Sequence, residues 1–374
     1  MNVRIFNRMV TGVALVGMGL AGCDSGGEPA EKAKDIPASA EKSPKQVPVP
    51  APSVLGQKSS DGGLDQLSAM LLRGRLSDEG LEILEEAVEQ NPAGAAEWAV
   101  TLPPGADRDT CLETVFYNWG WEDSTAALNF IRGTLRGMDR TLAAASVAEA
   151  MAEESPESAS AALALVAEPI PRGIVIESIV TSGLAASPDR TASWAQALSN
   201  PYERETALAA LASAWSEENP QACAAWLASN LNGDERVDAA VELMANWGST
   251  SPREAAQWLA GQRNAAGYID AGDELADAWA IVDPRAAAKW ALQETDPAAR
   301  EVFLETVVMN WVLNEAAETI NWANQLQNPE LRKAALDSAF FSLEDESPAA
   351  LDYWLESNPA HPAREAALKI RETE

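Results

Sequence analysis

The stretch 214-AWSEENPQACAAWLASN-230 places two tryptophans eleven residues apart, on either side of an Asn-Pro pair. The arrangement returns 32 residues later as 246-NWGSTSPREAAQWLAGQ-262, and once more as 278-AWAIVDPRAAAKWALQE-294. Self-similarity at a fixed period of about 20–50 residues is typical of repeat arrays. The spacing of these tryptophans therefore decides the fold class.

Four positions repeat with this period between residues 92 and 374. The first is usually proline: Pro92, Ser124, Pro156, Pro188, Pro220, Pro252, Pro284, Ala316 and Pro348. Six residues later stands the first aromatic position: Trp98, Phe130, Ala162, Trp194, Trp226, Trp258, Trp290, Trp322 and Trp354. Ten residues further stands the basic position: Arg108, Arg140, Arg172, Arg204, Arg236, Tyr268, Arg300, Arg332 and Arg364. Eleven residues after it stands the second aromatic position: Trp119, Met151, Gly183, Trp215, Trp247, Trp279, Trp311 and Leu343.

These positions predict two short helices in each unit. The residue before the proline position is Asn, Asp or Ser in eight of nine units. Such side chains cap helix N-termini, and proline suits the first helical position, so a first helix, helix A, begins there. In 236-RVDAAVELMANW-247 the apolar residues recur with helical spacing, which predicts a second helix, helix B, beginning near the basic position.

One such pair cannot bury two tryptophans, so successive pairs must stack. The sequence predicts an all-α, right-handed solenoid of about nine 32-residue helix-turn-helix repeats over residues 92–374, after a pair of capping helices at residues 64–91. Most tryptophans are expected to fill the spaces between hairpins: Trp98, Trp194, Trp215, Trp226, Trp247, Trp258, Trp279, Trp290, Trp311, Trp322 and Trp354.

The hairpins resemble tetratricopeptide repeats. In that family a proline also lies six residues before the large aromatic residue of the next helix A, as Pro220 precedes Trp226 here. The period is 32 residues rather than about 34, and Leu102 stands where the signature glycine of the family would be. The resemblance implies the architecture and a tendency to bind protein partners, but no particular binding residue.

The N-terminus carries a second resemblance. Arg4 and Arg8 flank the start of an apolar run that ends in Leu20-Ala21-Gly22-Cys23. The run is too short to cross a membrane and suits a secretory signal. Its ending resembles the lipobox of bacterial lipoproteins, which implies that residues 1–22 are a signal peptide and that Cys23 is acylated. We expect a protein anchored by lipid to a bacterial membrane and facing the periplasm or the exterior, with inner or outer membrane left open.

Charge and composition limit the classes of molecule that this chain is expected to bind. Residues 23–63 combine the lipidated cysteine with a segment that reads as a disordered tether, including PASAEKSPKQVPVPAPS. A net charge of −30 argues against nucleic acid and against binding to an anionic lipid surface. The acidity is equally compatible with a role in solubility alone.

The reactive side chains give no chemical signature. The lone histidine, His361, and the two thiols of Cys111 and Cys223 make no metal cluster and no nucleophile–base pair, so no cofactor and no catalytic residue is expected. Both cysteines replace alanines of sister units and are interpreted as packing residues. The repeated arginines could form a ligand ladder, but their recurrence favours a structural role: Arg108, Arg204, Arg236, Arg300 and Arg332.

The sequence therefore predicts a non-catalytic, lipid-anchored scaffold for protein–protein interaction in the cell envelope. A lipoprotein that binds polysaccharide or cell-wall glycan is the alternative, and a glycoside hydrolase of the α/α-toroid type is a third reading. Helix A lines the concave side of tetratricopeptide-like arrays, so the variable residue before its aromatic position either meets a partner or varies only because it lies on a solvated face. Trp121 lies off the grid and is the tryptophan expected to be exposed. The candidate partner-binding residues are Trp121, Gln257, Lys289, Asn321 and Tyr353.

Overall fold

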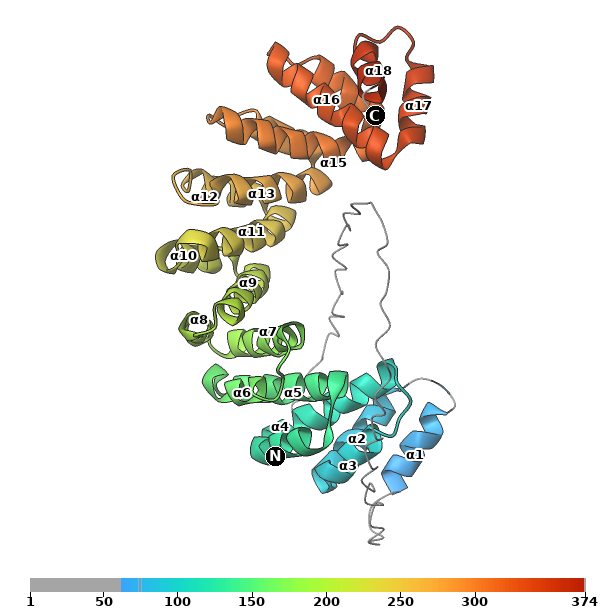
Figure 1. Cartoon of the computed structure of the whole chain (residues 1–374), viewed down its shortest axis with the longest axis vertical. Helices are drawn as coiled ribbons and strands as arrows, with labels where there is room; N and C mark the ends of the chain where they lie inside the picture. Colours follow the sequence, from blue (N-terminus) through green and yellow to red (C-terminus); the bar gives the residue numbers. More distant parts are fainter. Residues whose placement is uncertain (1–61, 73, 75, 373–374) are drawn as a thin grey trace, which may run out of the picture. The chain divides into compact units, whose positions relative to one another are not determined.

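The computed structural model describes residues 62–72, 74 and 76–372, and every regular element in this part is an α-helix (Figure 1). The predicted capping pair is present as α1 (Gly62–Leu71) and α2 (Asp78–Gln90). The remaining helices are α3 (Pro92–Ala99), α4 (Ala106–Thr134), α5 (Gly137–Ala152), α6 (Pro156–Leu163), α7 (Pro169–Ala186), α8 (Pro188–Ala197), α9 (Pro201–Glu218), α10 (Pro220–Asn230), α11 (Gly233–Thr250), α12 (Pro252–Ala260), α13 (Tyr268–Val282), α14 (Pro284–Ala291), α15 (Pro297–Asn324), α16 (Pro329–Glu346), α17 (Pro348–Ser357) and α18 (Arg364–Glu372). The predicted all-helical repeat fold is confirmed.

Helix A begins at the proline position in each of the seven units that have the proline. The preceding residue adopts a non-helical conformation, and where it is Asn219 its side-chain oxygen accepts a hydrogen bond from the amide of Ala222 at 3.1 Å. Asn91, Ser155 and Asp283 cap their helices in the same way. The capping residue and the proline together define the start of each helix A.

The two units without the proline keep the same break. Helix B of one unit and helix A of the next run together as α4 and α15, but each is interrupted by one residue, Asp123 (φ −150°, ψ 81°) and Glu315 (φ −135°, ψ 56°). Asp123 still caps, accepting from the amide of Ala126 at 2.9 Å. The Glu315 carboxylate instead accepts from Trp311 Nε1 at 2.9 Å. The chain therefore turns at this position with or without proline.

Helix B begins within three residues of the basic position in the units described. Consecutive B helices pack against each other in series, from α4 through α5, α7, α9, α11, α13 and α15 to α16. Helix A packs mainly against the B helices that precede and follow it. Successive A helices contact each other little, and the contacts lie between α6 and α8 and between α15 and α17. Helix B therefore forms the continuous layer of the stack.

Small residues allow the B helices to approach closely. A Cβ atom added to Gly248 would lie 2.9 Å from the Ala278 methyl group, and one added to Gly120 would lie 3.1 Å from the Ala150 methyl group. Gly183 stands at a second aromatic position, and there the buried side chain of Thr191 takes up the space, with its Oγ1 only 2.7 Å from where a Cβ would be. The missing tryptophan is thus compensated from α8.

Candidate functional site

The tryptophans at the two aromatic positions belong to the core, as predicted, but to different degrees. Every tryptophan at the second position is buried, with Trp311 only 1% exposed. At the first position Trp194 and Trp354 are buried, whereas the others pack against the core while keeping an edge in solvent: Trp98, Trp226, Trp258, Trp290 and Trp322. Each second-position ring contacts the first-position ring of the next unit, as Trp215 and Trp226 do with ring centroids 5.9 Å apart.

The arginines at the basic position serve the structure. Arg204 Nε lies 2.6 Å from Glu235 Oε1 in the next unit, and its Nη1 donates to the carbonyl of Leu198 at the end of helix A at 3.1 Å. Arg172 bonds in the same way to Glu203 and to the carbonyls of Leu163 and Val166. Arg108, Arg236 and Arg300 also bond to neighbouring loops or units, and Arg332 is half-buried at the start of α16. These bonds offset the cost of placing a cation at a helix N-terminus.

One unit replaces its arginine by Tyr268, and there a network around a buried carboxylate takes its place. The Glu294 carboxylate, 5% exposed, accepts from both Arg263 Nε and Nη2 at 3.2 Å, from the Tyr268 hydroxyl, and from the amides of Thr295 and Asp296. Burial alone would raise the pKa of Glu294, but the bonds from Arg263, Tyr268 and the amides outweigh it and lower the pKa to about 2. Sequence reasoning missed this cluster because Arg263 lies off the 32-residue grid.

The remaining polar candidates are also accounted for by packing. Cys111 and Cys223 are buried and free, and burial raises the pKa of each thiol to about 12, so neither is a ready nucleophile. His361 Nε2 lies 3.1 Å from Asn321 Oδ1, and the ring meets Trp354 edge-on. Within residues 62–72, 74 and 76–372, no cluster of three or more His, Cys, Asp or Glu side chains has the geometry to hold a metal ion.

The predicted helix A positions are all exposed. Gln257 on α12, Lys289 on α14, Asn321 on α15 and Tyr353 on α17 are open to solvent, and so are their five counterparts in the other units. The expectation that helix A lines the inner side of the stack is not met, however. The B helices are the ones in close contact from unit to unit, so helix B takes the closely packed side and the helix A positions lie on more separated helices.

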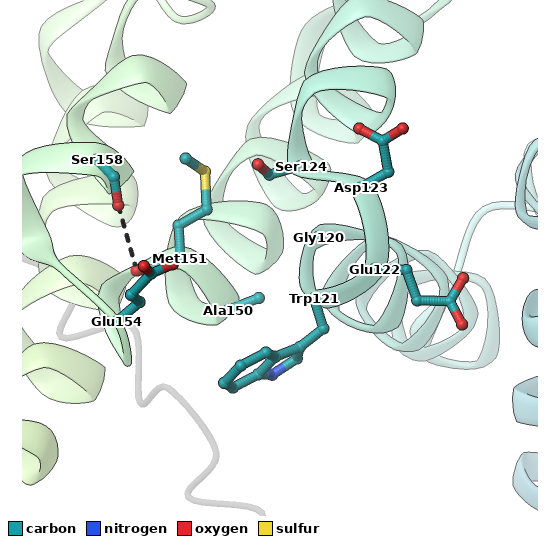
Figure 2. A pocket seen from close by; sticks show the side chains of 9 residues that line it. All are labelled: Gly120, Trp121, Glu122, Asp123, Ser124, Ala150, Met151, Glu154 and Ser158. Atoms are coloured by element: carbon teal, nitrogen blue, oxygen red, sulfur yellow. Dashed lines mark hydrogen bonds between the residues drawn. The ribbon is translucent and has the colours of Figure 1, made fainter.

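Trp121 is the exposed tryptophan, as predicted: 51% of its surface is accessible, the highest value among the thirteen, all of which are described. It lies beside an open hollow of about 300 Å³ between the α4 break at residues 120–124 and the end of α5, with Ser158 of α6 at its rim (Figure 2). We call this the Trp121 hollow. Met151, which stands at a second aromatic position, forms part of its wall, together with Ala150 and Glu154.

A second aromatic residue ties Trp121 to α5. The Tyr117 hydroxyl donates to Glu153 Oε1 at 2.7 Å. Burial raises the pKa of Tyr117 to about 12, and the bond to Glu153 and the nearby charge of Glu149 add to this, while a hydrogen bond with Trp121 acts in the opposite direction. Tyr117 therefore links the indole to carboxylates of the next unit. Residues 117 and 149 are one repeat period apart in the sequence, but only the packing of α4 on α5 shows that their side chains lie close together.

Comparison with known proteins adds no family. No protein-family model, no curated protein and no solved structure matches the chain. The tetratricopeptide and lipoprotein resemblances therefore stay predictions, and Cys23 lies outside the described residues. Among the helices of the described part, none has the length and apolar character needed to cross a membrane.

Proposed function

We propose that this chain is a non-catalytic scaffold that binds other proteins in the bacterial cell envelope, held at a membrane by lipid on Cys23. The observation that carries the proposal is that the repeated positions have different roles. The aromatic and basic positions are used for packing, whereas the residue before the first aromatic position is exposed in all nine units and differs from unit to unit. A surface that packing does not dictate and that runs through a whole array suits recognition of extended partners.

The glycan-binding alternative depends on aromatic faces presented to solvent. Only Trp121 among the thirteen tryptophans has more than a third of its surface exposed, and the five half-buried ones at the first aromatic position are packed against the core. A row of stacking platforms for sugar rings is therefore not the arrangement that these side chains favour. The protein-binding proposal fits them better.

The lipid anchor is tested at Cys23. In cells that express Cys23→Ala we expect the precursor to stay uncleaved and incorporation of labelled fatty acid to disappear. Cys111→Ala, which removes another thiol, is the matched control and should be labelled like the wild type. Membrane anchorage of Cys23→Ala with unchanged fatty-acid labelling would refute the anchor.

The scaffold itself is tested by crosslinking in living cells. A photo-crosslinking amino acid placed at Gln257 or Lys289 should give discrete adducts with envelope proteins, and one placed at the buried Leu259 should not. Absence of adducts at Gln257, Lys289, Asn321 and Tyr353 alike would show that helix A is not the surface that meets partners.

A further inference from the structure

The indole of Trp121 is joined to α5 through Tyr117 but keeps 51% of its surface in solvent. The equivalent residues of other units, two places after the second aromatic position, are Glu153, Ala185, Glu217, Ser249, Ile281, Leu313 and Asp345. Glu217 and Ser249 are exposed, like Trp121 itself. The array therefore accepts small, charged and aliphatic residues there, and only the unit of Trp121 presents an aromatic face to solvent. An exposed aromatic residue beside a hollow is a feature of binding sites rather than of cores.

The surroundings of the indole are negative. Glu153 and Glu154 at the end of α5 are exposed, and within the described part of the chain neither carboxylate is paired with an arginine or lysine. Arg190, which donates to the backbone carbonyl of Glu154, directs its Nε to Glu157 at 3.0 Å instead. Helix B of α4 and helix α5 end at the hollow, but the next helix A segment and α6 begin there as well, so the opposing helix dipoles offset each other and the carboxylates supply the negative charge.

An aromatic face beside carboxylates complements a positive side chain that has an apolar stem. Arginine and lysine stack their cationic groups on indole faces and bond to carboxylates, and tryptophan is the strongest of the aromatic partners. We propose that the Trp121 hollow receives an arginine or lysine side chain from a basic segment of a partner protein. This inference rests on the proposed scaffold function and specifies the chemistry of one of its partners.

The geometry favours a peptide over a free organic cation. A small quaternary ammonium ion needs several aromatic walls around it, whereas the Trp121 hollow has one indole and is open to solvent. Glu122 lines the hollow together with Glu154, and Glu153 is exposed next to Glu154, so that a chain with several positive side chains would meet more than one carboxylate. The net charge of −30 would speed the encounter with a basic segment.

The array supplies a matched control for the test. Glu217 and Glu218 stand in a later unit at the positions of Glu153 and Glu154 and are also exposed, but the residue one period before Glu217, which corresponds to Trp121, is Ala185. The variants E153Q/E154Q and E217Q/E218Q therefore remove the same charge from equivalent places. Any effect of overall acidity must be the same in both.

The experiment titrates the full chain with two labelled ten-residue peptides, one alternating Arg and Ser and the other carrying neutral citrulline in place of Arg. Fluorescence anisotropy at physiological salt gives the affinity. We expect the arginine peptide to bind at least about ten-fold more tightly than the citrulline peptide. E153Q/E154Q and W121A should each weaken binding by roughly five-fold, and E217Q/E218Q by less than about two-fold.

Equal binding of the two peptides would overturn the proposal, because the hollow would then not select a cation. Equal losses in E153Q/E154Q and E217Q/E218Q would overturn it as well, since the binding would follow net charge alone. Unchanged binding by W121A, with circular dichroism identical to the wild type, would exclude the indole. None of these results depends on crosslinking at Gln257 and Lys289. Failure of the proposal for the Trp121 hollow can therefore be distinguished from failure of the proposed scaffold function.

Discussion

The junctions at Asp123 and at Asn219 have almost the same backbone and different surfaces. The two residues have φ −150° in both cases, with ψ 81° and ψ 77°, and each caps the helix that follows through its side-chain oxygen. Both are preceded by a buried tryptophan, Trp119 or Trp215. Yet the first junction carries Trp121 and Ser124 where the second carries Glu217 and Pro220. The fold is therefore set by the capping residue and the buried ring, and the remaining positions are free to define a surface.

The largest effect is expected from the buried rings that both junctions share. Trp215→Ala and Trp119→Ala should each lower the free energy of unfolding by about 3–5 kcal/mol, because each removes a large buried side chain and its contact with a neighbouring aromatic ring. Urea unfolding followed by circular dichroism measures the change. A loss below about 1 kcal/mol at either position would mean that the second aromatic position is not essential to packing.

Replacing the buried carboxylate of Glu294 should also lower the free energy of unfolding, by an amount that depends on pH. The pKa of Glu294 in the folded chain, about 2, lies below its ordinary value of 4.5, so the carboxylate stabilises the fold above about pH 4.5 and this contribution disappears as the pH falls towards 2. Glu294→Gln should cost on the order of 2–3 kcal/mol at pH 7.

The difference between the Glu294→Gln variant and the wild type should shrink as the pH falls from about 4.5 to about 2. Unfolding curves at a series of pH values measure it. Glu217→Gln, at an exposed position of another unit, is the control and should show no such dependence. A gap of constant size across this range would contradict the role of the Glu294 charge.

The difference between residues that repeat and residues that break the repeat explains how much of the fold and of the candidate site could be predicted from the sequence. The helix starts and the Trp215–Trp226 contact follow from residues that recur in most units, because a pattern seen several times is less ambiguous than one seen once. The Glu294 network could not be predicted, because Tyr268 breaks the pattern and Arg263 replaces it from an irregular position. Which helices form the continuously packed layer could not be predicted either, because it depends on how closely small residues such as Gly248 and Ala278 let the B helices approach.

The two junctions also predict a smaller, reciprocal effect of proline. Ser124→Pro places proline at the first position of a helix whose preceding residue already has the conformation found before Pro220, so it should stabilise by about 0.4–1 kcal/mol. Pro220→Ser should destabilise by a similar amount. Melting temperatures of the two variants and of the double variant measure both changes. Destabilisation by Ser124→Pro would show that the Asp123 junction needs the amide hydrogen of residue 124.

The smallest effect on stability is expected at Trp121. Its side chain is 51% exposed and lies on the rim of an open hollow, so Trp121→Ala should change the free energy of unfolding by no more than about 0.5 kcal/mol. The same substitution two residues earlier, at the buried Trp119, is the matched control, with an expected cost several times larger. An indole that is half exposed and adds little to the stability of the fold is available for contact with a partner. A cost at Trp121 comparable to that at Trp119 would mean that the indole is part of the core, and the hollow would then lose the feature that marks it as a binding site.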